Sequence, residues 1–148
     1  MKNYGIELEG AIEYDFIDGV SRNNFYTGNT IPAFAGENVS FGDLVQYRSD
    51  EKFWKSDASV EDTSNGFITI SAETISQDAS GSFLVKGIIR DDSWNWTVGD
   101  ELYVSTLSGE ITGSNYAPSA SGEIARIIGY AKNATHIWFD PEKSYIES

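Results

Sequence analysis

Apolar and polar positions alternate with a period of two along most of the chain from about residue 40 onward. The apolar positions are rich in β-branched and aromatic side chains, as in strands with one buried and one exposed face. Clusters of Gly, Ser, Asn and Asp, which adopt turn conformations readily, separate these runs. The expected strands are Leu44–Tyr47, Phe67–Ser71, Phe83–Ile89, Glu101–Ser105, Ile124–Tyr130 and His136–Phe139. The pattern predicts an all-β fold, a small barrel or sandwich of short antiparallel strands.

Two parts of the chain repeat the same order of features. Gly42-Asp43 begins a series of a strand, a turn and further apolar runs, and Gly99-Asp100 begins a similar series. Gly permits positive φ and Asp can bond the backbone beyond it, so this dipeptide suits a turn that leads into a strand. We expect a β-domain, residues 36–148, with an internal two-fold repeat of similar halves at about 36–90 and 91–148. Two ordinary hairpins of similar composition are the alternative interpretation.

The first 35 residues have no counterpart in the repeat. Their apolar side chains alternate only loosely, at Ile6, Leu8, Ile12, Tyr14 and Phe16, and residues 19–29 are polar and turn-prone. One interpretation of residues 1–35 is an N-terminal arm that becomes ordered on a partner. The other is a first β-hairpin packed on the domain. The arm is favoured because nothing later in the chain matches this region.

Composition narrows the classes of function. A length of 148 residues fits one compact domain, and the absence of cysteine excludes disulfides and thiolate metal sites. No apolar run approaches the roughly 20 residues of a membrane span, and no signal peptide is recognisable. The expected protein is therefore soluble and made in a cytoplasm. A net charge of −13, from 23 acidic and 10 basic residues, disfavours binding to nucleic acid or to anionic membrane.

Catalytic and metal-binding patterns are weak in this sequence. His136 is the only histidine and lies at the start of an apolar run, which favours a structural role. No Gly-x-Ser-x-Gly motif is present, and chance acid pairs are expected among 23 acidic residues. Asp91, Asp92, Asn95 and Asp100 could offer oxygen ligands to calcium, but they lack the spacing of an EF-hand loop. We expect no enzyme, no cofactor and no metal.

The aromatic pair Trp94 and Trp96 is the most distinctive local feature. The two indoles share one side of a strand if Asn95 lies on the other side. They could form core, subunit contact or a sugar-stacking platform, and the first two are favoured because aromatic side chains anchor interfaces. Trp54 and Trp138 occupy apolar strand positions and are expected in the core.

The residues around this pair carry a resemblance to a known class of protein. The segments Asp92–Gly99, Leu102–Ser105 and Gly109–Thr112, followed by Pro118–Gly122, Ile127–Ala131 and Ile137–Pro141, resemble a module of tailed-bacteriophage structural proteins. That module is found in head-fibre, capsid-decoration and tail-fibre components. The resemblance covers residues 85–147 well and residues 36–84 only through the repeat. The two-half Gly-Asp pattern is also similar to small decoration (cement) proteins, whose β-rich domains sit as trimers on icosahedral heads.

The resemblance implies a non-enzymatic protein of the virion surface. Its expected role is to decorate and stabilise the outer capsid as a homotrimer bound to the major capsid protein. The alternative is a head- or tail-fibre module that binds host surface glycans, with sugar rings stacked on aromatic side chains. The candidate interface residues are Trp94, Trp96, Tyr116, Tyr14, Phe16, Phe25 and Tyr26. If residues 1–35 form the arm, deleting residues 1–30 is expected to abolish capsid binding and leave a folded trimer.

Overall fold

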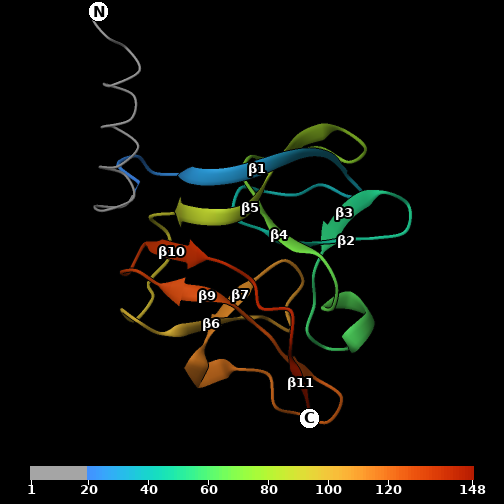
Figure 1. The fold of residues 1–148 in the computed structure, drawn as a ribbon, viewed down its shortest axis with the longest axis vertical. Coiled ribbons are helices and arrows are strands. Elements are labelled where there is room, and N and C mark those ends of the chain that lie inside the picture. Colours follow the sequence, from blue (N-terminus) through green and yellow to red (C-terminus); the bar gives the residue numbers. More distant parts are fainter. Residues whose placement is uncertain (1–19) are drawn as a thin grey trace, which may run out of the picture.

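The computed structural model describes residues 20–148, and these form short strands and two single helical turns (Figure 1). The strands are β1 (Phe25–Ala35), β2 (Leu44–Tyr47), β3 (Lys52–Lys55), β4 (Ile68–Ser71), β5 (Ser80–Arg90), β6 (Glu101–Val104), β7 (Ile111–Gly113), β8 (Ile124–Ala125), β9 (Ile127–Ala131), β10 (His136–Phe139) and β11 (Ile146–Glu147). The turns are η1 (Glu61–Thr63) and η2 (Ser114–Tyr116). The predicted all-β class is confirmed.

Nine strands form one sheet, in the order β1-β3-β2-β4-β5-β10-β9-β6-β7. An additional pairing between β1 and β5 closes the first five strands of this order into a small barrel. The inside of the barrel holds a separate apolar cluster that includes Val45, Phe53 and Phe83. The rings of Phe53 and Phe83 stack with centroids 4.4 Å apart. Strand β8 pairs with β11 in a second, two-stranded sheet.

The strand order confirms the internal repeat. The first half contributes β3-β2-β4-β5 and the second half contributes β7-β6-β9-β10, which is the same local topology. The two halves meet edge to edge where β5 and β10 pair antiparallel, from His136 opposite Arg90 to Phe139 opposite Gly87. The sheet therefore continues through the boundary between the halves.

The two Gly-Asp dipeptides form the same turn. Gly42 and Gly99 have φ values of 87° and 82°, a region open to glycine because it lacks a Cβ. The Gly42 N–H donates to Ser71 O at 2.8 Å, and the Gly99 N–H donates to Ala131 O at 2.7 Å. The following Asp43 and Asp100 N–H groups each close a four-residue turn at 3.0 Å. The sequence repeat is thus a repeat of backbone hydrogen bonds.

The arm interpretation is wrong for residues 25–35. These residues form β1, which pairs with β5 from Phe25 opposite Arg90 to Phe34 opposite Ser80. Ala35 is fully buried in the barrel. The period-two pattern does not reveal this strand, because Gly28 and Pro32 interrupt its apolar positions and because the register shifts after Asn29. The rest of the proposed arm, residues 1–19 with Tyr14 and Phe16, lies outside the described residues.

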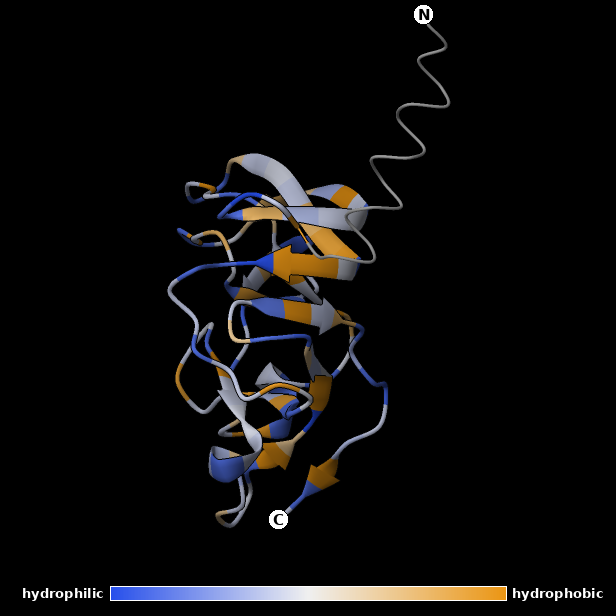
Figure 2. Ribbon diagram, turned by 90° about the vertical axis from the view of Figure 1, so that its left-hand side faces the viewer, coloured by the Kyte–Doolittle hydropathy of each residue, from blue (hydrophilic) through white to orange (hydrophobic). Residues whose placement is uncertain are grey.

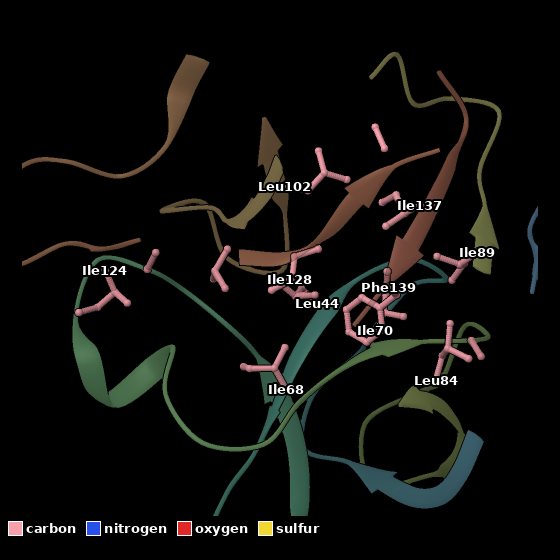
Figure 3. Close-up of a cluster of buried hydrophobic side chains, with 14 residues drawn as sticks. Leu44, Ile68, Ile70, Leu84, Ile89, Leu102, Ile124, Ile128, Ile137 and Phe139 are labelled. Atoms are coloured by element: carbon pink, nitrogen blue, oxygen red, sulfur yellow. The ribbon is translucent and has the colours of Figure 1, made fainter. Parts of the chain in front are cut away.

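The larger of the two apolar clusters, the main core, draws on both halves. Leu44, Ile70 and Leu84 from the first half point toward Leu102 and Phe139 from the second half (Figure 3). Strands of both halves contain apolar residues (Figure 2), and the fully buried ones include Leu84 of β5 and Ile137 of β10. Burying apolar surface at about 25 cal/mol per Å² is the main source of stability in such a fold. The main core draws on both halves, whereas the barrel cluster draws on β1 and the first half alone.

Replacing Gly28 is expected to destabilise the barrel strongly. Its φ is 139°, and an added Cβ would lie 2.3 Å from Lys86 O and 2.7 Å from Gly87 Cα on the paired strand. Gly28→Ala should therefore lower the free energy of unfolding by more than about 2 kcal/mol, measured by urea denaturation.

Gly66→Ala is the matched control, because Gly66 also has positive φ (70°) but open space around its Cβ position. Gly66→Ala should lower the free energy of unfolding only by the cost of placing alanine at positive φ, about 1 kcal/mol. Equal losses in the two variants would contradict a close backbone approach between β1 and β5.

Candidate functional site

The described surface is hollowed where β5 changes its partner. Strand β5 pairs with β4 through Phe83 and Leu84, and with β10 from Gly87 onward. Between these pairings the β1 ladder passes from Lys86 to Leu84, so Val85 has no partner in it. Strands β4 and β10 separate at this point, and two adjoining hollows open there. We call them together the junction groove, formed chiefly by Asn29, Phe67, Lys86, Arg126, Tyr130, Trp138, Asp140, Glu142 and Lys143.

The first hollow has an aromatic wall. Its volume is about 520 Å³, and Trp138 and Tyr130 line it. Trp138 lies opposite Ile88 on one side and Tyr130 on the other, so the three side chains share one face of the sheet. Trp138 is 50% exposed and Tyr130 is 41% exposed. The expectation that Trp138 is core is therefore wrong, because Ile137 and Phe139 take the core face of β10.

The second hollow is lined by basic side chains. It also measures about 520 Å³, and Lys86, Arg126 and Lys143 lie along it together with Phe67. Lys86 and Asp140 line both hollows, with 3.6 Å between Lys86 Nζ and a carboxylate oxygen. About two thirds of each of these side chains is exposed, so solvent weakens their attraction. The ammonium group therefore remains available to another anion.

Arg126 is a charged side chain held inside the protein. It is 3% exposed, its Nε donates to Glu142 O at 2.6 Å, and its Nη1 donates to Ser64 O at 3.0 Å. Among the described residues it forms no ion pair with Asp or Glu. Burial lowers the pKa of the Arg126 guanidinium from its ordinary value, because desolvation disfavours the charged form. The side chain links the η1 segment of the first half to the C-terminal segment.

Backbone hydrogen bonds fix the acidic rim of the groove. Asp140 N–H donates to Ile128 O at 3.0 Å and Glu142 N–H donates to Ile127 O at 2.9 Å. These bonds hold the segment after β10 against the start of β9. The two carboxylates are thus carried on ordered backbone, although both residues are exposed.

The predicted Trp94–Trp96 pair lies in a connection and not in a strand. The ring centroids are 5.8 Å apart, and both rings pack against the main core. Trp96 N–H donates to Ala134 O at 2.9 Å, as Val39 N–H donates to Ile75 O at 2.9 Å in the first half. Each residue stands three positions before the glycine of its turn. Trp96 therefore occupies the second-half equivalent of a buried barrel position.

The other predicted interface residues fall in two separate places. Tyr116 is 81% exposed and lines a shallow hollow together with Trp96. Phe25 and Tyr26 lie in β1 with ring centroids 5.4 Å apart, and the Arg22 guanidinium lies 4.1 Å from the Phe25 centroid. Tyr26 packs against the main core. None of these residues lines the junction groove.

His136 and Arg90 together hold the start of the described chain. The buried His136 ring donates from Nε2 to Val20 O at 2.9 Å, and Arg90 Nη1 donates to the same oxygen at 3.0 Å. The Nδ1 side of the ring faces Asn133 Oδ1 at 2.8 Å. Val20 itself is 2% exposed. We call this arrangement the Val20 anchor, and it gives the only histidine a positioning role.

Acidic side chains gather where the second half departs from the barrel. Asp43, Asp91 and Glu110 line a hollow beside Trp94. Burial raises the pKa of the Asp43 carboxyl above its ordinary value, and Glu37 and Glu110 add repulsion, while the Ser40 N–H and Lys55 oppose the rise. Within residues 20–148 no group of three or more His, Asp or Glu side chains is placed to hold a metal ion.

Comparison of the chain with models of protein families, with curated proteins and with solved structures finds no match. In the part of the chain that the structure describes, no helix has the length and apolar character needed to cross a bilayer. The resemblance of residues 85–147 to phage structural modules therefore stays a prediction.

Asp43→Asn is expected to stabilise the protein at neutral pH. Because the folded-state pKa is raised, the contribution of Asp43 is present at low pH and is lost as the pH rises above about 4. The amide oxygen can still accept from Ser40 N–H, now 2.9 Å from the carboxylate. Urea denaturation at neutral pH should show a gain of less than about 1 kcal/mol, which disappears near pH 4.

Asp100→Asn tests the equivalent position of the repeat. The Asp100 carboxylate accepts from Ser114 N–H at 3.1 Å and from the Ser114 hydroxyl. Its replacement should cost about 1 kcal/mol at neutral pH. A gain in the free energy of unfolding in both variants would contradict the different environments of Asp43 and Asp100.

Proposed function

We propose that this chain is a non-enzymatic structural protein of a tailed-phage virion, which decorates and stabilises the outer capsid as a homotrimer. In this proposal the partner is the major capsid protein and the location is the virion surface. Such a protein acts by binding the assembled shell and not the dissociated one, so that mass action stabilises the shell. No chemical step is involved.

The observation that carries the attachment mechanism is the Val20 anchor. A buried carbonyl that receives one donor from β10 and one from β5 fixes the point at which residues 1–19 join the body. Both donors come from the paired edge at which the two halves meet. A force applied to the N-terminal segment would therefore be transmitted to the centre of the sheet. This arrangement supports residues 1–19 as the segment that attaches the body to a capsid.

The body suits a decoration protein because one sheet runs through both of its halves. The sheet runs without interruption through β5 and β10, and the main core draws on both halves. A body of this kind can span neighbouring capsomers without an internal hinge. Its net charge of −13 favours solubility before assembly.

A fibre module that binds host surface glycans is the second candidate. It is favoured by the exposed aromatic wall of the junction groove, formed by Trp138 and Tyr130. The sequence placed sugar stacking on Trp94, Trp96 and Tyr116, but the rings of the first two pack against the core. The candidate sugar-binding surface is therefore the aromatic wall of the junction groove.

Deletion of residues 1–19 is expected to abolish capsid binding and leave a folded trimer. This replaces the deletion of residues 1–30, which would remove half of β1 and open the barrel. The truncation keeps Val20 and every described strand. Occupancy on purified heads should fall below about a tenth of the full-length value, measured by cosedimentation and by electron microscopy of the particles.

Circular dichroism and thermal unfolding should show that the truncated body still folds. Leu107→Ala, a change in an exposed side chain of the turn between β6 and β7, should bind heads like the unaltered chain. Unchanged occupancy of the truncated protein would overturn the arm mechanism. If electron microscopy locates the protein on the tail and not on the head, the capsid assignment is wrong.

A further inference from the structure

We propose that the junction groove is a binding site for an acidic saccharide, with sugar rings against Trp138 and Tyr130 and a carboxylate or phosphate at Arg126, Lys86 and Lys143. The inference deepens the glycan-binding candidate and does not depend on capsid attachment. Its residues lie in the body, whereas the attachment segment precedes Val20.

The aromatic end of the groove has the form that a pyranose ring requires. Two neighbouring aromatic side chains on paired strands, Trp138 and Tyr130, are 50% and 41% exposed. An aromatic face carries partial negative charge and attracts the polarised C–H groups on one side of a sugar ring. The backbone of Gly28 and Gly87 lines the same hollow, so no side chain fills it from β1 and β5 at that point.

The basic end of the groove supplies the charge that an acidic ligand requires. The chain has 10 basic residues against 23 acidic ones, yet Lys86, Arg126 and Lys143 line the same hollow. The concentration is local, because the protein as a whole would repel anions. Asp140 lines this hollow too, but it is shared with the aromatic hollow and only partly offsets three cations.

Arg126 gives the strongest indication of an anion. Burying a guanidinium without a carboxylate partner is costly, and its hydrogen bonds go to two neutral carbonyl groups. A bound carboxylate or phosphate would neutralise this charge and could accept paired N–H groups in the fork geometry of arginine. Lys86 could contribute by exchanging its exposed partner Asp140 for the ligand.

The size of the groove fits an oligosaccharide better than a protein surface. Each hollow measures about 520 Å³, within the usual range of roughly 300 to 1,000 Å³ for small-molecule sites. The rim offers hydrogen-bonding groups of both kinds: Asn29 can donate and accept, and Glu142 can accept from sugar hydroxyls. A protein interface would need a larger and more continuous area of about 800 Å² on this side.

The test uses the full chain on an array that pairs neutral oligosaccharides with their sialylated, uronic-acid and phosphorylated counterparts. Acidic members should bind and their neutral partners should bind at least about tenfold more weakly. The strongest acidic ligand is then titrated by calorimetry at low and high salt. Affinity should fall as salt rises, because screening weakens charge pairing at a partly exposed site.

Two variants separate the two ends of the groove. Trp138→Ala should weaken every bound saccharide by about tenfold or more. Lys143→Gln, a change in an exposed side chain, should weaken acidic ligands and leave neutral ones unchanged. The matched controls are Phe34→Ala for an exposed aromatic ring elsewhere and Lys52→Gln for a basic side chain outside the groove, and both should bind normally.

Several results would overturn the proposal. These are no saccharide bound on the array, equal binding of neutral and acidic partners, or binding that survives both Trp138→Ala and Lys143→Gln. If Trp138→Ala changes the number of subunits in the oligomer, the aromatic face is a subunit contact instead. Failure of this site would leave the effect of deleting residues 1–19 on heads unchanged, so the two proposals fail separately.

Discussion

The structure depends on one strand, β5, and on its change of partner along its length. Its first part completes a five-stranded barrel with β1 and β4, and its last part pairs with β10 and carries the sheet into the second half. Both hydrophobic clusters draw on this strand, through Phe83 in one and through Leu84 and Ile89 in the other. The junction groove also exists because β4 and β10 cannot both follow β5 at the same point.

The repeat explains why one half closes and the other stays open. Each half builds the same turn, hairpin and pair of following strands. In the first half, Phe34 and Ala35 of β1 pair with Lys52 and Phe53 of β3 and seal the barrel. In the second half no strand pairs with β7 in the way that β1 pairs with β3 within the described residues, and the chain after β5 packs Trp94 and Trp96 against the main core.

The sequence predicts the strands whose environment is local and misses those whose environment depends on distant partners. Strands β2 and β10 have the predicted bounds, because each is a short, mostly apolar run between polar turn residues. Strand β1 was missed because its pattern is broken by Gly28 and Pro32, and because its partner β5 lies far along the chain. The predicted strand Ile124–Tyr130 is divided into β8 and β9 at Arg126, whose side chain is buried.

The candidate site was harder to predict than the fold for a related reason. Trp138 alternates with Ile137 and Phe139, so the sequence indicates that one of the two faces is exposed but not which one. The pairing of Trp138 with Ile88 and Tyr130 decides which face of β10 is exposed, and this register is set by tertiary pairing. The basic hollow combines Lys86 of β5, Arg126 between β8 and β9, and Lys143 of the C-terminal segment. No spacing in the sequence indicates that these residues meet.

The long pairing of β1 with β5 also has a consequence for folding during synthesis. Strand β1 leaves the ribosome early, but most of its hydrogen-bonding partners belong to a strand made much later. Until then it presents an unpaired edge that carries Phe25, Tyr26 and Phe34. Non-local pairing of this kind slows folding and prolongs the exposure of intermediates to one another. The nascent chain, more than the finished protein, is therefore the form most exposed to aggregation.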